Sequence, residues 1–265
     1  MNSLKPASHW ILKKYFTMVD SLDMNVAEYE FAHAVDSLYK FLWDSYADWY
    51  VEYLKTDKTQ LNFAKELFKE FVITASPYIP FEAEVLWKEY FGETSILAHH
   101  LQSSEFNDTY KPAVDQASVD EFDNIVEVIT SIRSTRGLFA IDPGTALVIH
   151  SESGLLTGYA TFLEKTARTT LDPSTNSTLY TVVVGDINYA LDINKFVSDP
   201  QQEIMRTNKI IESLIDQKNS LEKQLSNQQF LQNAGEDVIA QKRDDLEART
   251  NEIRQQESKL EFLNK

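Results

Sequence analysis

The stretch "FLWDSYADWYVEYLK", residues 41–55, holds two tryptophans and three tyrosines in a segment whose apolar residues recur every three or four positions. That spacing is typical of an α-helix. Two apolar stripes run along the helix. The first comprises Phe31, Val35, Leu38, Leu42, Ser45 and Trp49, and the second comprises Tyr39, Trp43, Tyr46, Tyr50 and Tyr53. A helix with two apolar sides is expected to be buried on both, as in a helical bundle.

A narrow polar strip completes the circumference of this helix. Its members are Asp36, Lys40, Asp44, Asp48 and Glu52. Asp44 and Asp48 have the spacing of paired carboxylates for acid–base chemistry, but no histidine accompanies them on the strip. We therefore interpret the strip as a solvated helix face.

The same periodicity extends this helix over residues 25–54 and predicts three more helices around it, over residues 9–24, 59–75 and 80–91. Asn25 followed by Glu28 has the layout of a capping box, which predicts a helix start at Asn25. Pro80 stands where a first helical turn tolerates proline. Four amphipathic helices are enough for a bundle.

The composition is that of a folded chain without cysteine chemistry. Of its 265 residues, 43% are hydrophobic and none is cysteine, so disulfides and thiolate metal sites are excluded. No apolar run approaches the roughly 18 residues of a membrane span. The N-terminus "MNSLKPASHW" lacks the apolar core of a signal peptide. We expect a cytoplasmic protein with no membrane partner.

A different pattern begins after a polar stretch over residues 102–118. A helix is predicted over residues 119–136. Its inward-facing residues are Phe122, Ile125, Val126, Ile129 and Ile132. It leads into a region of short β-branched segments.

These segments predict a small α+β unit. "TALVIHS" (145–151) and "LYTVVVGDINYALDI" (179–193) are rich in β-branched residues, and "GLLTGYATFLEKTARTTL" (154–171) between them is predicted to be a helix. Antiparallel strands are expected to turn at Gly185 and Asp186.

Residues 200–265 carry a heptad repeat. Its seam positions are Ile204, Ile211, Lys218 and Leu225, with Thr207, Leu214 and Leu221 interleaved, and then Ile239, Leu246, Ile253 and Leu260. The two repeats are separated by "SNQQFLQNAGED" (226–237), which is long enough for a return turn. An antiparallel coiled-coil hairpin within a monomer is the favoured interpretation. An intermolecular parallel coiled coil is the alternative.

The remaining patterns contain no catalytic, metal or cofactor site. His99 and His100 are adjacent and lack partner ligands, while His9, His33 and His150 are isolated. "DPGTA" (142–146) does not continue as a phosphate loop, and no glycine-spaced dinucleotide fingerprint occurs. No turn marks a serine nucleophile. Nothing in the sequence predicts chemistry.

Charge is distributed unevenly along the chain. The net charge of −16 argues against a nucleic-acid partner, yet residues 200–265 hold 10 of the 25 cations. The candidate RNA-contacting residues are Arg206, Lys209, Lys218, Lys223, Lys242, Arg243, Arg249 and Arg254. An equally weighted interpretation is a salt-bridged coiled-coil surface, because acidic neighbours are frequent.

Several motifs, in order, resemble one family. "HWILKKYF", "FAHAVDSLYKFLWDSYADWYVEYLK" and "SPYIPFEAEVLW" are similar to the helical anticodon-binding domain of valyl-tRNA synthetases. "VEVITSIRSTRG" resembles the helix that enters the small α+β junction of that family. "QLSNQQFLQNAGEDVIAQKRDDLEARTNEI" is similar to the tip and return helix of its C-terminal coiled-coil arm. The resemblance covers nearly the whole chain.

The resemblance implies a mainly α fold of the class I synthetase type, with a helical bundle (1–111), an α+β junction (112–199) and a coiled-coil arm (200–265). It implies a non-catalytic portion that positions valine tRNA for ATP-dependent aminoacylation. The bundle would lie near the anticodon stem-loop and the arm against the outer corner of the RNA.

Parts of the family pattern are missing from this sequence. The His-Ile-Gly-His and Lys-Met-Ser-Lys-Ser type signatures of the catalytic domain, which uses ATP and Mg, do not occur, and the editing domain is absent. The Asn-Lys-Leu-Trp-Asn-Ala…Arg-Phe helix before the bundle, which in the family supplies anticodon contacts, is also missing. We therefore expect no cofactor, no aminoacylation and weak reading of the anticodon by this chain alone.

A second class of function is kept open. A freestanding synthetase-derived chain could act as a protein-interaction or regulatory module, an interpretation favoured by the charge of −16 and the initiator-like Met1. The reading frame upstream of codon 1 would distinguish the two classes.

Overall fold

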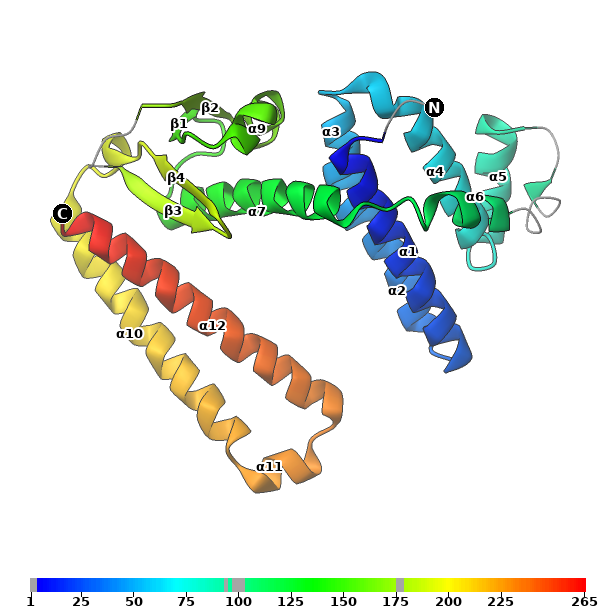
Figure 1. Ribbon diagram of the computed structural model, residues 1–265. Helices are drawn as coiled ribbons and strands as arrows, with labels where there is room; N and C mark the ends of the chain where they lie inside the picture. The colour runs from blue at the N-terminus through cyan, green and yellow to red at the C-terminus, as the bar shows by residue number, and fades with distance from the viewer. Residues whose placement is uncertain (1–3, 93–94, 97–102, 175–178) are drawn as a thin grey trace. The chain divides into compact units, whose positions relative to one another are not determined.

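The computed structural model describes residues 4–92, 95–96, 103–174 and 179–265 (Figure 1). These residues form two compact units, which are described separately. Helices make up most of both units, beside a small sheet, so the mainly α fold class is confirmed.

Unit 1 comprises Met1–Thr130 and Gly154–Ala167, and unit 2 comprises Ser131–Ser153 and Arg168–Lys265. One long helix, α7, contributes residues to both. The division into parts 1–111, 112–199 and 200–265 stays a prediction.

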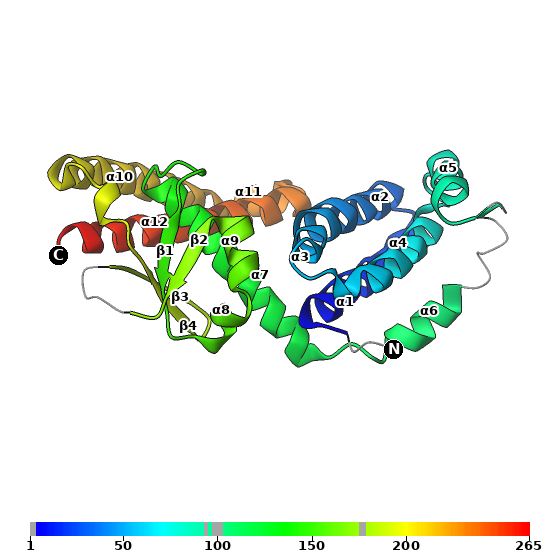
Figure 2. The ribbon, with the colours of Figure 1, turned by 90° about the horizontal axis from the view of Figure 1, so that it is seen from above.

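Unit 1 is the predicted helical bundle, in which α1, α2 and α4 run side by side (Figure 2). Its elements are α1 (Pro6–Ala27), α2 (Phe31–Lys40), the π-helix η1 (Phe41–Val51), α3 (Glu52–Leu54), the 3₁₀-helix η2 (Lys58–Gln60), α4 (Leu61–Ala75), α5 (Pro80–Tyr90), α6 (Ser103–Tyr110), the first part of α7 (Gln116–Leu138), α8 (Gly154–Gly158) and α9 (Ala160–Ala167). Aromatic side chains fill its core. The Phe122 ring contacts Trp10 edge-on at 5.3 Å between ring centres and stacks on Phe162 at 5.8 Å.

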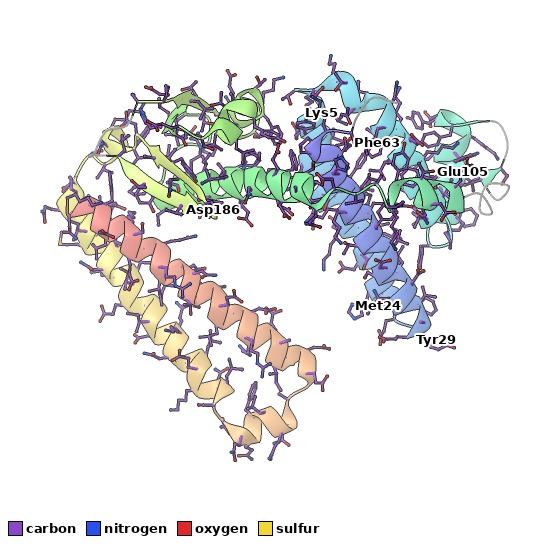
Figure 3. The ribbon with its side chains drawn as sticks, in the orientation of Figure 1. Lys5, Met24, Tyr29, Phe63, Glu105 and Asp186 are labelled. Carbon is purple, nitrogen blue, oxygen red and sulfur yellow. The ribbon has the colours of Figure 1, made fainter. Side chains whose placement is uncertain are left out.

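The predicted helix start at Asn25 is wrong. Asn25 lies in the last turns of α1, where its side-chain amide donates to Ser21 Oγ at 3.1 Å. The chain then turns at Tyr29, whose φ of 62° is left-handed, and Glu30 N–H returns to the Asn25 carbonyl at 2.7 Å. This is a Schellman-type end with tyrosine where glycine is usual. Tyr29 lies at the end of the α1–α2 hairpin (Figure 3), and α2 begins at Phe31.

The two buried stripes predicted for the second helix are only partly correct. Phe31, Val35, Tyr39 and Trp43 are between 47% and 59% exposed, and Trp49 is half-buried, whereas Tyr50 is 0% exposed. Phe31, Val35 and Tyr39 lie on the exposed face of α2. From Phe41 to Val51 the wider turn of η1, closed by i→i+5 hydrogen bonds, places residues four or five apart on one face. The Tyr46 ring accordingly contacts Phe41 at 6.2 Å and Tyr50 at 5.8 Å.

The polar stretch over residues 102–118 contains a helix that was not predicted. Helix α6 lies within it, and Phe106 contacts Tyr15 edge-on at 5.8 Å. Helix α7 begins at Gln116, three residues before the predicted start, because Asp115 caps it by accepting from Ser118 N–H at 3.0 Å. Of the residues predicted to face inward, Val126 is only half-buried, and Val128 is buried beside the others.

Unit 2 contains a four-stranded sheet in the order β2-β1-β4-β3 among its described residues. Its strands are β1 (Leu147–His150), β2 (Thr169–Asp172), β3 (Tyr180–Val184) and β4 (Ile187–Leu191), and the 3₁₀-helix η4 (Asn194–Phe196) follows. Val184 pairs with Ile187, and Gly185 has a φ of 53°, so the predicted hairpin tip is confirmed.

Strand β2 was not predicted. The helix expected over residues 154–171 ends at Ala167, and Arg168 turns the chain with a φ of 50°. Thr169 then pairs in parallel with Leu147 of β1. The β-branched Thr169 and Thr170 favour a strand, and pairing with β1 overrides the helical pattern that precedes them.

The last part of unit 2 is an antiparallel helical hairpin, called the arm (Figure 1). It consists of α10 (Pro200–Leu225), α11 (Gln228–Asn233) at the tip and α12 (Glu236–Leu263). Asp199 caps α10 by accepting from Gln202 N–H at 3.0 Å, and Pro200 follows at the first helical position. The intramolecular hairpin was the favoured prediction, and the structure confirms it.

Two further predictions from the sequence concern metal ligands and membrane spans. His99 and His100 lie outside the described residues, so the structure does not test them. Within the described ranges, no three His, Asp or Glu side chains gather as metal ligands. No helix in those ranges has the length and apolar character needed to cross a membrane.

Candidate nucleic-acid interface

The arm is held together by a narrow seam between α10 and α12. Thr207, Leu214 and Ile253 are buried, and the other predicted seam residues are half-buried. The heptad spacing therefore identified the contacting faces correctly. On α12 the interleaved seam positions are polar, because Lys242, Arg249 and Gln256 occupy them.

Three of the eight candidate cations belong to this seam. Lys218, Lys242 and Arg249 are half-buried, with side chains 33–35% exposed. Each has an acidic neighbour on its own helix. The ion pairs are Lys218 with Glu222 at 3.7 Å, Lys242 with Asp245 at 3.9 Å, and Arg249 with Glu252 at 2.6 Å. These three cations cover the apolar seam with their side-chain stems, so the salt-bridged interpretation holds for them.

The other five candidate cations are exposed. Arg206 pairs with Glu203 at 3.7 Å, and Arg254 donates to the Asn251 amide oxygen at 3.3 Å. Lys209, Lys223 and Arg243 have no ion-pair partner in the described part of the chain. We call these three residues the free arm cations.

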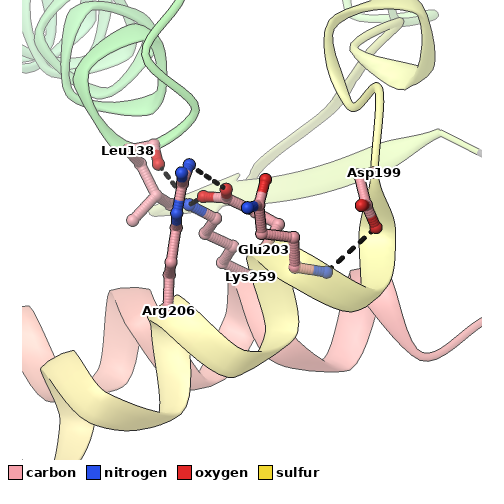
Figure 4. Close-up of polar contacts among 6 residues, drawn as sticks. Leu138, Asp199, Glu203, Arg206 and Lys259 are labelled. Atoms are coloured by element: carbon pink, nitrogen blue, oxygen red, sulfur yellow. Dashed lines mark hydrogen bonds and ion pairs between the residues drawn. The ribbon is translucent and has the colours of Figure 1, made fainter.

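A cation that the sequence analysis did not single out lies at the base of the arm. Lys259 is 3% exposed, and its ammonium donates to Glu203 Oε1 at 2.5 Å and to the Leu138 carbonyl at 2.7 Å (Figure 4). It also lies 5.1 Å from the centre of the Phe139 ring. The contacts join the start of α10, the end of α12 and the end of α7.

An aromatic cluster surrounds this cation. Phe139, Tyr180 and Phe262 meet edge-on, with ring centres 5.1 to 5.9 Å apart. The Tyr180 hydroxyl and Ser258 Oγ are 3.2 Å apart, which ties β3 to α12. The arm is thus anchored at its base by a hydrogen-bonded cation and packed rings, while its outer part relies on the seam alone.

A second buried cation organises the junction. Arg136 is 5% exposed, and its guanidinium donates to the carbonyls of Thr145 at 2.8 Å, Asp142 at 3.3 Å and Arg168 at 3.2 Å. Burial lowers the pKa of Arg136, and the nearby positive charge of Arg168 adds to this. Its donors are used within the fold, so this arginine is structural.

For one of the two buried cations, Lys259, the neighbouring sequence contains an indication of its role. Lys259 immediately precedes the seam residue Leu260 and lies three residues before Phe262, at the edge of an apolar face. A cation in such a position can lie over a ring or reach a carbonyl. The heptad alone does not show which partner it finds.

Comparison with known proteins identifies the family of this chain. Residues 8–150 match the model described as "Anticodon-binding domain of tRNA ligase", which covers more than half of the chain. The chain belongs to this family. Membership supports a tRNA-binding role for the anticodon-binding domain within residues 8–150.

Full-length similarity extends beyond the part that the family model matches. The chain is 25% identical over 277 residues to the valine--tRNA ligase of Zymomonas mobilis, covering 97% of this chain and 31% of the relative. It is 28% identical over 282 residues to that of Pseudothermotoga lettingae, covering 100% and 30%. It is 27% identical over 263 residues to that of a Nitratiruptor species, covering 96% and 29%.

The resemblance to valyl-tRNA synthetases is confirmed by these matches, which include the arm. The chain spans about 30% of the length of these relatives. The relatives are therefore much longer than the part of them that matches this chain.

Proposed function

We propose that this chain is the non-catalytic, tRNA-binding portion of a valyl-tRNA synthetase. It holds valine tRNA for ATP-dependent aminoacylation by a catalytic domain that this sequence does not contain. ATP and Mg serve that domain, and the chain itself uses no cofactor. We infer that it is a cytoplasmic monomer. The family match supports binding of tRNA, and similarity to valine--tRNA ligases supports the choice of valine tRNA.

The observation that carries the proposal on the arm is the set of free arm cations. Lys209, Lys223 and Arg243 are exposed and lack acidic partners among the described residues, so each can approach a phosphate without first breaking an ion pair. Phosphate contacts supply affinity without sequence preference. We therefore expect the isolated chain to bind tRNA weakly and with little preference for valine tRNA, since the remainder of the chain is acidic.

Filter binding at two or more salt concentrations tests this proposal. A variant with Lys209, Lys223 and Arg243 changed to Gln should bind tRNA more weakly. Its dependence of log affinity on log salt should be flatter, by roughly 0.7 to 0.9 per lost contact.

The matched control changes the three seam cations, Lys218, Lys242 and Arg249, to Gln. It removes the same charge, but the removed cations are half-buried and paired. We expect a smaller effect on the salt slope, with helicity monitored by circular dichroism. Unchanged affinity and slope in the free-cation variant would reject the arm as the RNA contact.

A second candidate function is supported by the net charge of −16, which disfavours a polyanionic ligand. A freestanding protein-interaction or regulatory module derived from a synthetase would tolerate this charge. Translation of the DNA upstream of codon 1 distinguishes the two functions. An in-frame synthetase catalytic core supports the first, and a stop codon supports the second.

A further inference from the structure

A row of large apolar side chains is exposed along α2 and at its two ends. Its members are Tyr29, Phe31, Val35, Tyr39 and Trp43, and we call this row the α2 ridge. Each of these side chains is between 47% and 81% exposed. Single exposed apolar residues are common on protein surfaces, but a contiguous row of them marks an interaction site.

Neighbouring side chains make the ridge continuous. Phe31, Val35 and Tyr39 are four residues apart, so they share one face of α2. At one end the Tyr29 ring meets Phe31 edge-on, with ring centres 6.5 Å apart. At the other end Tyr39 stacks on Trp43 at 6.2 Å. At the usual rise of a helix, the ridge from Phe31 to Trp43 is about 18 Å long, which is about three turns of a second helix laid along it.

The charges along the ridge are mostly negative. Residues 28–48 carry five carboxylates and one lysine, and that lysine, Lys40, is paired with Asp36 at 2.7 Å. The other four carboxylates are exposed and have no ion-pair partner in the part of the chain that the structure describes. They are Glu28, Glu30, Asp44 and Asp48. The apolar ridge therefore lies among uncompensated negative charges.

This charge decides which partner fits the apolar surface. A second copy of the chain would bring the same carboxylates to the ridge, and like charges repel at close range. RNA is disfavoured for the same reason, because it is a polyanion. A helix with an apolar stripe between rows of Lys or Arg complements both features, since its stripe covers the rings while its cations approach Glu30 and Asp44.

We propose that the α2 ridge binds a basic amphipathic helix of a partner protein. Tyr39 and Trp43 supply the central contact, because exposed aromatic side chains of this kind commonly dominate the binding energy of protein interfaces. The carboxylates attract the helix and fix its orientation. This interaction goes beyond the proposed tRNA binding, since the ridge lies in unit 1 and the free arm cations lie in unit 2.

The probe is a synthetic peptide of about 14 leucine and lysine residues, long enough to cover the ridge as a helix. Its leucines recur every three or four positions, and it is labelled with fluorescein and titrated against the full chain. Binding should raise the fluorescence anisotropy. One control peptide has glutamate in place of lysine, and another has the same composition without the helical period. Each should bind about tenfold more weakly or worse.

The apolar contact is tested by combining Val35→Ser with Tyr39→Ser. Both residues are exposed, so the bundle should remain folded, which circular dichroism checks. This ridge variant should bind the leucine–lysine peptide about tenfold more weakly, the usual effect of truncating two central interface residues. The matched control combines Phe81→Ser with Val85→Ser, at positions of α5 that are 82% and 61% exposed. It should bind as the unchanged chain does.

The charge is tested by combining Glu30→Gln with Asp44→Asn. The affinity should fall about fivefold at low salt, and the difference should shrink as salt screens the charges. The matched control, Asp237→Asn with Asp244→Asn, removes the same charge from exposed positions of the arm and should leave binding unchanged. The variant that lacks the free arm cations should also leave it unchanged, which separates this test from that of tRNA binding.

Three results would overturn the proposal. Equal binding of the three peptides, or equal losses in the ridge and control variants, would show that the peptide associates non-specifically with an acidic protein. Loss of tRNA binding in the ridge variant, with peptide binding retained, would make the ridge an RNA contact. A dimer in sedimentation that the ridge variant abolishes would show that a second copy of the chain covers the ridge.

Discussion

The bundle of unit 1 and the arm of unit 2 are both helical, but they bury their side chains differently. In the bundle, rings from several helices meet, and Tyr50 and Trp87 are almost completely buried. In the arm, only two helices face each other, and even the seam positions remain mostly half-buried. A two-helix hairpin has too little apolar contact to exclude water, so polar and charged residues share its seam.

The difference between the bundle and the arm explains which arm cations lack an ion-pair partner. In the arm's seam, Lys218, Lys242 and Arg249 lie along apolar surface and find acidic neighbours on the same helix. On the outer faces, Lys209, Lys223 and Arg243 find none among the described residues. Only at its base does the arm resemble the bundle, with aromatic rings that pack edge-on. Stability is therefore concentrated at one end of the arm.

The largest expected effect is a loss of stability in the bundle. Tyr50→Ala should lower the free energy of unfolding by about 3 to 5 kcal/mol, the usual cost of emptying a large aromatic site. The loss also leaves Ser8 without its 2.8 Å hydroxyl contact. Urea unfolding measures the change. Tyr39→Ala, at a 59% exposed position, is the control and should cost less than about 1 kcal/mol.

Substitution of the neighbouring residue Trp49 tests how η1 orients its aromatic side chains. Because it is half-buried, Trp49→Ala should cost clearly less than Tyr50→Ala in the same urea experiment. The two apolar stripes, read with an α-helical period, place both residues on buried sides and would give similar losses. Equal or reversed losses would show that η1 is an ordinary α-helix in solution.

A smaller effect is expected at the base of the arm. Lys259→Ala removes the cation that joins Glu203 and the Leu138 carbonyl. We expect a loss of about 2 to 3 kcal/mol, less than the 3 to 5 kcal/mol of a fully buried pair because the Glu203 side chain is 29% exposed.

Hydrogen exchange of α10 and α12 is the informative readout for Lys259→Ala. Protection should fall first at the arm and be retained in unit 1, because the two units are compact on their own. Lys223→Ala, at an exposed and unpaired position, is the control. Uniform loss of protection throughout the chain would contradict independent anchoring of the arm.

Filling the seam should have a smaller effect of opposite sign. Lys218→Leu replaces a half-buried cation at a heptad position and should stabilise the arm by about 1 kcal/mol. Thermal unfolding measures the gain. Sedimentation of both proteins checks the monomer prediction. A concentration-dependent dimer of the unchanged chain that disappears on deleting residues 200–265 would contradict it.

The smallest effect concerns pH and the bundle. Burial is the main reason why the pKa of Glu70 rises from its ordinary 4.5 to about 7, and its Oε2 has no hydrogen-bond partner within the described residues. The folded state therefore retains a proton that the unfolded state releases between about pH 4.5 and 7. The unfolding free energy should fall as pH rises through this window.

Glu70→Gln tests that effect. Because the side chain is only half-buried, solvent screening reduces the effect to about 1 kcal/mol. The variant should be more stable than the unchanged chain at pH 8 and equally stable at pH 4, as measured by urea unfolding. A stability curve between these pH values that is the same for both proteins would show that Glu70 is solvated.

Much of this architecture could be predicted from the sequence because it depends on local periodicity. The heptads of residues 200–265 predict apolar helix faces that pack together, and the connection over residues 226–237 is long enough for a return of the chain. The β-branched run around Gly185 likewise specifies a hairpin. Short-range patterns are enough to specify the helices of the arm and the tip of the β-hairpin.

What the sequence could not determine depends on partners distant along the chain. Strand β2 exists because Thr169 finds β1, and η1 rotates the aromatic residues away from their expected faces. The free arm cations are exposed, whereas the seam cations are half-buried because they face the other helix of the arm. Lys259 is buried because three helix ends converge on it. Periodicity specifies which face of a helix is apolar, but burial and charge pairing are decided by what the tertiary structure packs against that face.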